Sequence, residues 1–146
     1  MITLKPITKD NWHDVCVKLS LEEAQKNFVA PNWYSVLEGI FNENFVSRAV
    51  YAGEELVGYT LYGLDAETNQ WWIIRLMTDK NHQHKGYGRA TMLALIEAIR
   101  AQPGCDAIYI SFEPENDVAR KLYTSLKFED TGRIEHGEVV YRLWLG

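Results

Sequence analysis

One stretch of the sequence constrains the fold more than any other: a strand that runs through a glycine-containing turn into a helix, at residues 77–99. Apolar residues between Met92 and Ile99 repeat with the spacing of one helix face. Residues 71–78, before the turn, are rich in aromatic and β-branched side chains, which favours a strand. The glycines therefore fall where a loop becomes a helix.

The start of that helix is suited to binding an anion. The first backbone N–H groups of a helix have no partner within it and carry the positive end of its dipole. Gly86 and Gly88 have no Cβ, so the backbone can approach a ligand closely, and Lys85 and Arg89 add positive charge. The spacing differs from G-x-x-x-x-G-K-[ST], and no acidic residue follows at the dinucleotide spacing, which disfavours nucleoside triphosphate and NAD sites.

Composition narrows the function classes. The 146 residues are 47% hydrophobic, so we expect a single domain, residues 1–146, with a substantial core. A net charge of −5 and a pI of about 5.4 disfavour a nucleic-acid partner and allow a cationic small substrate. No apolar run reaches the length of a membrane span and the N-terminus lacks a signal-peptide layout, so we expect a cytoplasmic protein with no membrane contact.

The cysteines and histidines indicate neither a disulfide framework nor a metal site. Cys16 and Cys105 lie far apart and outside any C-x-x-C pattern, so we expect two reduced thiols. The four histidines show no zinc-ligand spacing, and we assign no metal.

The N-terminal part is expected to be a strand followed by helices. Residues 2–7 alternate apolar and polar side chains, and Pro6 indicates a sheet edge or a strand end. Three helical signals follow before residue 42. They are a helix capped by Asp10 or Asn11, a capping box at Ser20 and Glu23, and a helix over about 35–41 with Val36, Leu37 and Ile40 on its apolar side.

The middle of the chain predicts a sheet. Residues 45–51 and 56–64 form a hairpin, and with residues 71–78 they give three antiparallel strands. The continuous apolar run at 107–112 is typical of a strand covered on both faces. Because a helix separates it from residues 71–78, the two strands should be parallel neighbours.

A last helix and hairpin complete the chain. Asn116 is a candidate helix cap, and residues 128–133 and 139–145 form a closing hairpin whose final strand is apolar enough to suggest an edge or an interface. The fold class is therefore α/β: one mixed sheet with antiparallel N-terminal strands, a central parallel βαβ pair, and helices on both faces.

Two motifs resemble a known family. Gln83-x-x-Gly86-x-Gly88 after a strand resembles the acetyl-CoA loop of the GNAT family of N-acetyltransferases. Leu-Tyr-Thr-Ser-Leu-Lys-Phe at 122–128 resembles the family's L-Y-x-x-x-G-F, with Lys127 at the usual glycine, which puts a turn geometry in doubt. The resemblance covers almost the whole chain and implies a GNAT-like fold with acetyl-CoA as cofactor.

The resemblance also implies where the cofactor binds. In that family the strand before the glycine loop splays from the next strand at a β-bulge, and the pantetheine arm lies in the gap. A backbone N–H near Met77 would polarise the thioester carbonyl. The residues implied to contact the cofactor are Leu76, Met77, Thr78, Gln83, His84, Lys85, Gly86, Tyr87, Gly88, Arg89 and Asn116.

Acetyl transfer to an amine needs a neutral amine and a proton for the departing thiolate. The resemblance implies Tyr123 as the acid, although its place on an apolar helix face also suits a core aromatic. Many relatives carry a glutamate eight residues before the Gln83 position, but here Arg75 stands there, and arginine cannot act as a base. Glu113 is either a base acting through water or a solvated loop carboxylate, so the base stays unassigned.

Residues 25–32, Arg75 and the short length resemble the bacterial spermine/spermidine acetyltransferases, so a polyamine is the expected acceptor. A polyamine favours carboxylates and aromatic faces. The candidate substrate-binding residues are Glu22, Glu23, Tyr34 and Glu38, whose acidic members are also ordinary on a solvated helix. The alternatives are a protein or peptide amine, an aminoglycoside, a non-catalytic acetyl-CoA sensor, and an interaction protein. Relatives are often dimers, so the resemblance also implies a homodimer.

Overall fold

The computed structural model describes residues 1–22, 25–26 and 30–146. Seven strands in these residues form one mixed sheet in the order β1-β2-β3-β4-β5-β7-β6. The strands are β1 (Ile2–Pro6), β2 (Phe45–Ala52), β3 (Glu55–Asp65), β4 (Gln70–Thr78), β5 (Ala107–Phe112), β6 (Glu129–Glu135) and β7 (Glu138–Trp144). The helical elements are η1 (Asp14–Lys18), α1 (Asn32–Phe41), η3 (Lys80–His82), α2 (Tyr87–Arg100) and α3 (Asp117–Ser125).

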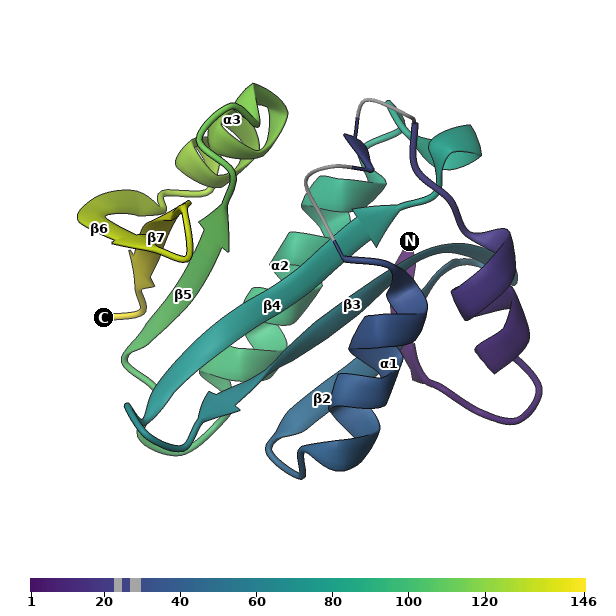
Figure 1. The fold of residues 1–146 in the computed structure, drawn as a ribbon, viewed down its shortest axis with the longest axis horizontal. Coiled ribbons are helices and arrows are strands. Elements are labelled where there is room, and N and C mark those ends of the chain that lie inside the picture. Colours follow the sequence, from purple (N-terminus) through teal and green to yellow (C-terminus); the bar gives the residue numbers. More distant parts are fainter. Residues whose placement is uncertain (23–24, 27–29) are drawn as a thin grey trace.

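The expected sheet is confirmed. Strands β1 to β4 are antiparallel neighbours, and β4 is parallel to β5 (Figure 1). Strand β1 is an edge strand that ends at Pro6, as the proline predicts. Strand β7 lies between β5 and β6, so the expectation of an edge strand was wrong, whereas the alternative of an interface stays a prediction. An apolar run can equally mark a strand paired on both sides.

Helices α2 and α3 cover one face of the sheet. Met92, Leu95 and Ile99 of α2 are fully buried and belong to one core with Ile108 and residues of α3. Burying each such side chain contributes roughly 1.5–3 kcal/mol. This core fixes the helix that follows the glycine loop against the parallel strand pair.

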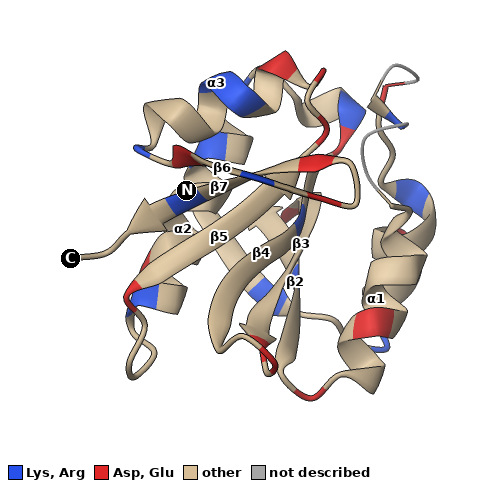
Figure 2. Ribbon diagram, turned by 60° about the vertical axis from the view of Figure 1, so that its left-hand side comes forward, with Lys and Arg blue, Asp and Glu red and all other residues tan. Residues whose placement is uncertain are grey.

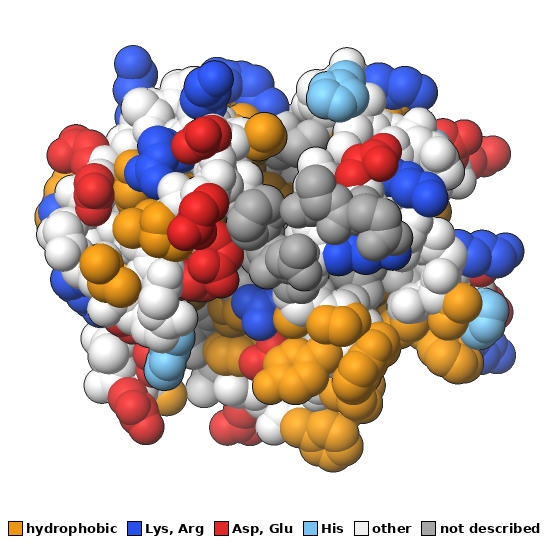
Figure 3. Space-filling model, turned by 45° about the horizontal axis from the view of Figure 1, so that its top comes forward, with side chains coloured by type: hydrophobic (Ala, Val, Ile, Leu, Met, Phe, Trp, Pro, Cys, Tyr) orange, Lys and Arg blue, Asp and Glu red, His pale blue; other side chains and the backbone are white. Residues whose placement is uncertain are grey.

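Helix α1 and η1 cover the opposite face, which confirms helices on both faces (Figure 1). Val15 of η1 and Val36 of α1 pack with Tyr59 and Leu61 of β3. Leu37 and Ile40, expected on the apolar side of this helix, are 46% and 66% exposed, so that side is only partly buried. Apolar side chains gather on the surface in the region of α1 (Figure 3). The apolar stripe of this helix is wider than its contact with the sheet.

The region before α1 differs from the expected helices. The predicted cap at Asp10 or Asn11 was wrong: η1 is a short π-helix with His13 at its N-cap, and the Asn11 carboxamide oxygen accepts from the Thr8 N–H. The capping box at Ser20 falls on Glu23, which lies outside the described residues. Helix α1 begins at Asn32, three residues earlier than expected, because Pro31 at its N-cap starts the helix. None of the helices described here has the length and apolar content needed to cross a bilayer.

Candidate active site

Strand β4 separates from β5 partway along its length. The parallel ladder runs from the Trp71–Ile108 pair to the Ile73–Ile110 pair and stops there. On its other edge β4 stays paired with β3, but Leu61 faces Arg75 while the next residue, Tyr62, faces Ile73. Ile74 is therefore an extra residue, a bulge that bends the strand. The expected splay at a β-bulge is confirmed.

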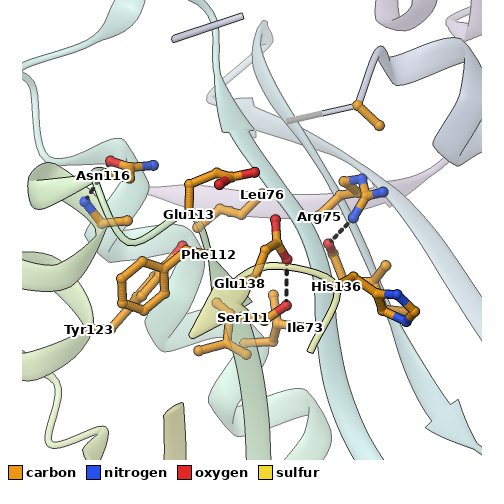
Figure 4. A pocket seen from close by; sticks show the side chains of 14 residues that line it. Ile73, Arg75, Leu76, Ser111, Phe112, Glu113, Asn116, Tyr123, His136 and Glu138 are labelled. Atoms are coloured by element: carbon orange, nitrogen blue, oxygen red, sulfur yellow. Dashed lines mark hydrogen bonds between the residues drawn. The ribbon is translucent and has the colours of Figure 1, made fainter. Parts of the chain in front are cut away.

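A cavity of about 490 Å³, the first cavity, opens in this gap (Figure 4). Residues 73–76 of β4 and 110–113 at the end of β5 form two of its walls. The remaining described lining residues are Ala30, Asn116, Ala119, Tyr123, His136 and Glu138. The cavity therefore lies beside the part of β4 whose outer edge has no strand partner.

The glycine turn caps α2 beyond the end of β4. Gly86 is the N-cap of α2 with φ 81°, a left-handed conformation that glycine adopts without strain. A Cβ at Gly88 would approach no protein atom more closely than 3.7 Å, so contacts within the described protein leave room for a side chain there. The backbone N–H groups of residues 86–89 donate to no other described residue. Free amides beside an open surface at a helix N-terminus suit a diphosphate.

Two side chains of the turn are engaged within the protein. Gln83 Nε2 donates to Gln25 Oε1 at 2.8 Å and to the Thr78 carbonyl at 3.1 Å. Arg89 Nη1 donates to Ser125 Oγ at 2.7 Å, which ties the start of α2 to the end of α3. These contacts position the turn, and its backbone remains available to a ligand.

The turn is also fixed by a buried carboxylate. Asp79 is 5% exposed, and its Oδ1 accepts from the Ser20 N–H at 2.9 Å. Its Oδ2 bonds to His82 Nδ1 at 2.9 Å. Hydrogen bonds to a carboxylate are among the stronger ones in proteins. Asp79 therefore holds the end of β4 and the turn in one arrangement.

Tyr123 reaches the first cavity from α3. Its side chain is 8% exposed and packs against Phe112 and Phe128. Burial raises the pKa of its phenol, and the nearby Glu138 raises it further. The hydroxyl makes no hydrogen bond to another described residue, although a buried tyrosine usually finds a partner. It is therefore a protonated donor free to meet a ligand in the cavity.

Arg75 also borders this cavity. Its Nη1 donates to the Ile74 carbonyl at 2.7 Å, directly at the bulge (Figure 4). The carbonyl of Arg75 itself accepts from Thr60 Oγ1 at 2.7 Å. Arg75 thus stabilises the distorted strand. It stands at the position where many members of the family that the sequence resembles carry a glutamate.

A second cavity of about 550 Å³ adjoins the first. Four residues line both, namely Ile74, Ser111, His136 and Glu138. Among its described lining residues five are acidic and none is lysine or arginine; the acidic ones are Glu38, Asp65, Glu67, Glu135 and Glu138. Figure 2 shows acidic residues on α1 and on the β6–β7 hairpin. This second cavity is suited to a cation.

The expected site residues divide between these places. Leu76, Asn116 and Tyr123 line the first cavity, although the Asn116 side chain is also bonded to the Ala119 N–H as the cap of α3. Glu38 lines the second cavity. Met77, Thr78, Glu22 and Tyr34 line neither cavity, and Glu23 lies outside the described residues. The roles assigned to all of these residues stay predictions.

Sequence reasoning missed Ser111, His136 and Glu138. His136 lies in the β6–β7 turn, Glu138 is the first residue of β7, and Ser111 lies in a buried strand, so no local motif distinguishes them. Both cysteines are free, as expected. Within the described residues, no group of three His, Cys, Asp or Glu side chains is arranged to hold a metal ion.

Comparison with known proteins gives consistent matches. The family model for the acetyltransferase (GNAT) family matches residues 11–128. A spermine/spermidine N(1)-acetyltransferase of Bacillus subtilis is 26% identical over 146 residues, covering 95% of each chain. A probable spermine N(1)-acetyltransferase of B. subtilis subsp. natto is 27% identical with the same coverage.

Solved structures share the fold. A domain from Methanocaldococcus jannaschii superposes with a TM-score of 0.79 at 17% identity, covering 99% of both chains. A B. subtilis acetyltransferase solved in complex with CoA gives a TM-score of 0.67 at 21% identity, covering 99% of this chain and 98% of that one.

Proposed function

This chain belongs to the acetyltransferase (GNAT) family and is an N-acetyltransferase of a family that uses acetyl-CoA, and we propose that its acceptor is a polyamine such as spermidine or spermine. The observation that carries the proposal is the second cavity, whose described charged lining is entirely acidic. Two relatives at 26–27% identity carry names that specify the same substrate class.

We expect the cofactor to bind at the glycine turn and in the gap between β4 and β5. The free amides of residues 86–89 and the charges of Lys85 and Arg89 would hold its diphosphate. The outer edge of β4 from Ile74 to Thr78, unpaired toward β5, would hydrogen-bond its pantetheine arm. When bound, acetyl-CoA would supply an acetyl thioester, which a pantetheine arm in the gap would bring toward the residues that line both cavities.

In this proposal Tyr123 donates a proton to the departing sulfur. Its hydroxyl is free of described protein partners and lies in the first cavity. Since its pKa is raised, the phenol remains protonated throughout the neutral range. Holding thioester and amine together supplies much of the remaining acceleration.

The second cavity suits a molecule with several ammonium groups. An aliphatic amine has a pKa of about 10.4, so each amine of a polyamine is mostly charged at pH 7. Glu38 Oε1 is buried and has no hydrogen-bond partner in the described structure. A buried carboxylate oxygen without a partner is unfavourable, so an ammonium group would compensate it. One amine would then sit at the shared wall while another lies near Glu38.

A panel of acceptors tests the proposal through release of coenzyme A. We expect kcat/KM for spermidine and spermine to exceed that for a monoamine of matched length by roughly tenfold, because a second ammonium contact is worth about 1–2 kcal/mol. A peptide N-terminus or an aminoglycoside that outcompetes spermidine would contradict the polyamine assignment. If no amine in the panel caused release of coenzyme A, the protein would bind the cofactor without transferring its acetyl group.

Glu38→Gln sharpens the same test. We expect KM for spermidine to rise about fivefold, with a smaller change for the monoamine, because a charged hydrogen bond is lost. Glu43→Gln is the matched control, since Glu43 is exposed and lines neither cavity. Equal changes in both variants would show that Glu38 does not contact the acceptor.

A homodimer is part of the proposal. Its support is the exposed apolar surface of α1, formed by Trp33, Leu37, Ile40 and Phe41. Light scattering during gel filtration should give twice the mass of one chain, and Phe41→Asp should shift the protein to the monomer mass. A wild-type protein of monomer mass at micromolar concentration would contradict it.

A further inference from the structure

Glu138 occupies the wall between the two cavities. It begins β7, and the Phe112–Val139 pair places it beside the end of β5, where that strand leaves β4. It lines both cavities, so it borders the path that any group must cross between them. A carboxylate at this point would be close to a cofactor arm in the first cavity and to an acceptor in the second.

The Glu138 side chain is held in one orientation. Ser111 Oγ donates to Glu138 Oε1 at 2.8 Å (Figure 4). The two residues are diagonal neighbours across the β5–β7 pair and lie on the same face of the sheet. The other carboxylate oxygen has no hydrogen bond within the described protein and points away from Ser111 into the cavity. One oxygen is thus fixed and the other is free to accept a proton.

No other described ionisable group combines a place in the lining of both cavities with a hydrogen bond that fixes its side chain, as Glu138 does. Among the described titratable residues, His136 is the other one that lines both cavities. It is exposed on a turn, and no described residue hydrogen-bonds its ring. The remaining charged or titratable lining groups are Arg75, Glu113 and Tyr123 in the first cavity and Glu38, Asp65, Glu67 and Glu135 in the second.

We propose that Glu138 is the general base of acetyl transfer, held in place by Ser111. This inference rests on the N-acetyltransferase activity and not on the identity of the amine. Only roughly one aliphatic amine in 2,500 is neutral at pH 7, so removal of a proton from the ammonium is required before attack. Glu138 supplies the carboxylate that Arg75 replaces in β4.

The proton balance is complete. The acceptor ammonium gives one proton to the Glu138 carboxylate, which becomes the neutral acid. The nitrogen lone pair forms the bond to the acetyl carbon, and the carbon–sulfur bond breaks with its electrons passing to sulfur. Tyr123 gives its proton to sulfur, and the second proton of the nitrogen restores the phenol. The products are the amide and the thiol, and Glu138 returns its proton to solvent.

Glu138→Gln tests the base with any amine that the enzyme turns over. The amide retains an oxygen to accept from Ser111, so we expect the fold to persist, which thermal unfolding checks. At saturating amine kcat should fall about 100-fold or more, while the dissociation constant of acetyl-CoA stays within about twofold. With hydroxylamine, which is already neutral at the assay pH, the loss should shrink to less than about fivefold, because no base is needed.

Five further variants make the result decisive. Glu129→Gln, on the exposed edge strand outside both cavities, should leave kcat unchanged. Ser111→Ala should lower kcat by about fivefold without changing KM for acetyl-CoA, and Ser111→Thr should restore it, because Ser111 is a positioning residue. The proposal is overturned if Glu138→Gln keeps a third of wild-type kcat, if its loss is equal with hydroxylamine, or if Glu113→Gln or His136→Gln costs more. A failure of polyamines in the acceptor panel would leave this test intact.

Discussion

The two halves of β4 differ in how many of their edges are paired with another strand. From Trp71 to Ile73 the strand is paired on both edges, with β3 and with β5. From Arg75 to Thr78 it is paired only with β3, and the first cavity lies where β5 would continue. One extra residue, Ile74, separates the closed half from the open half. The comparison teaches that a single bulge can accompany the change from a strand paired on both edges to one with a free edge.

The largest expected effect lies on the open half. Tyr123→Phe removes the donor that faces this gap and should lower kcat about 100-fold, equivalent to roughly 2.7 kcal/mol. The dissociation constant of acetyl-CoA should change little, because the ring remains in its apolar contacts. Steady-state kinetics and calorimetric titration measure the two quantities. An unchanged kcat would make Tyr123 a core aromatic only.

The closed half should respond in stability instead of catalysis. Gly63 pairs with Trp72, and a Cβ at Gly63 would lie 2.8 Å from Phe45 Cα, in backbone that cannot easily move. Gly63→Ala should therefore lower the free energy of unfolding by about 1–3 kcal/mol. Urea denaturation measures the change. A variant as stable as wild type would show that the closed half tolerates movement.

Gly88→Ala should give the opposite pattern. The protein leaves room for a methyl group there, and alanine favours a helix more than glycine does, so stability should not fall. The affinity for acetyl-CoA should fall about tenfold, about 1.4 kcal/mol, because the methyl group meets the diphosphate. A loss of stability with unchanged affinity would show that the fold needs glycine at this position and that binding of acetyl-CoA does not.

The smallest effect concerns α3, which carries Tyr123. Lys127 has φ 76°, so the chain keeps the left-handed geometry despite the missing glycine, and the Phe128 N–H donates to the Tyr123 carbonyl at 3.0 Å. Lys127→Gly should raise the free energy of unfolding by about 0.5–1 kcal/mol with kcat unchanged, since a side chain in this conformation is strained. Chemical denaturation measures the free energy of unfolding, and an activity assay measures kcat. A variant less stable than wild type would contradict the proposed backbone strain at Lys127.

Elements with strong local signals could be predicted from the sequence. The apolar spacing from Met92 to Ile99 predicts α2, and Asn116 predicts the start of α3, where its side chain does accept from the Ala119 N–H at 3.1 Å. The splay of β4 followed from the family resemblance. Such signals depend on residues within a few positions of each other, so they survive without knowledge of the tertiary fold.

Features that depend on tertiary contacts could not be predicted. Glu138 looks like part of a hairpin turn, and only the β5–β7 register brings it to Ser111, 27 positions away in sequence. Leu37 and Ile40 carry a helical apolar pattern, but the pattern does not say how much of a helix face the sheet covers. The carboxylates of the second cavity come from separate elements, so no single motif contains them.

The shared wall of the two cavities bears on inhibition. Ile74 and Ser111 border both spaces, so the two substrates would approach the same point from different sides. A single compound that joins the sulfur of coenzyme A to a diamine through a short bridge would occupy both spaces at once. Tethering removes the entropic cost of capturing the second part, so such a compound should bind far more tightly than either half.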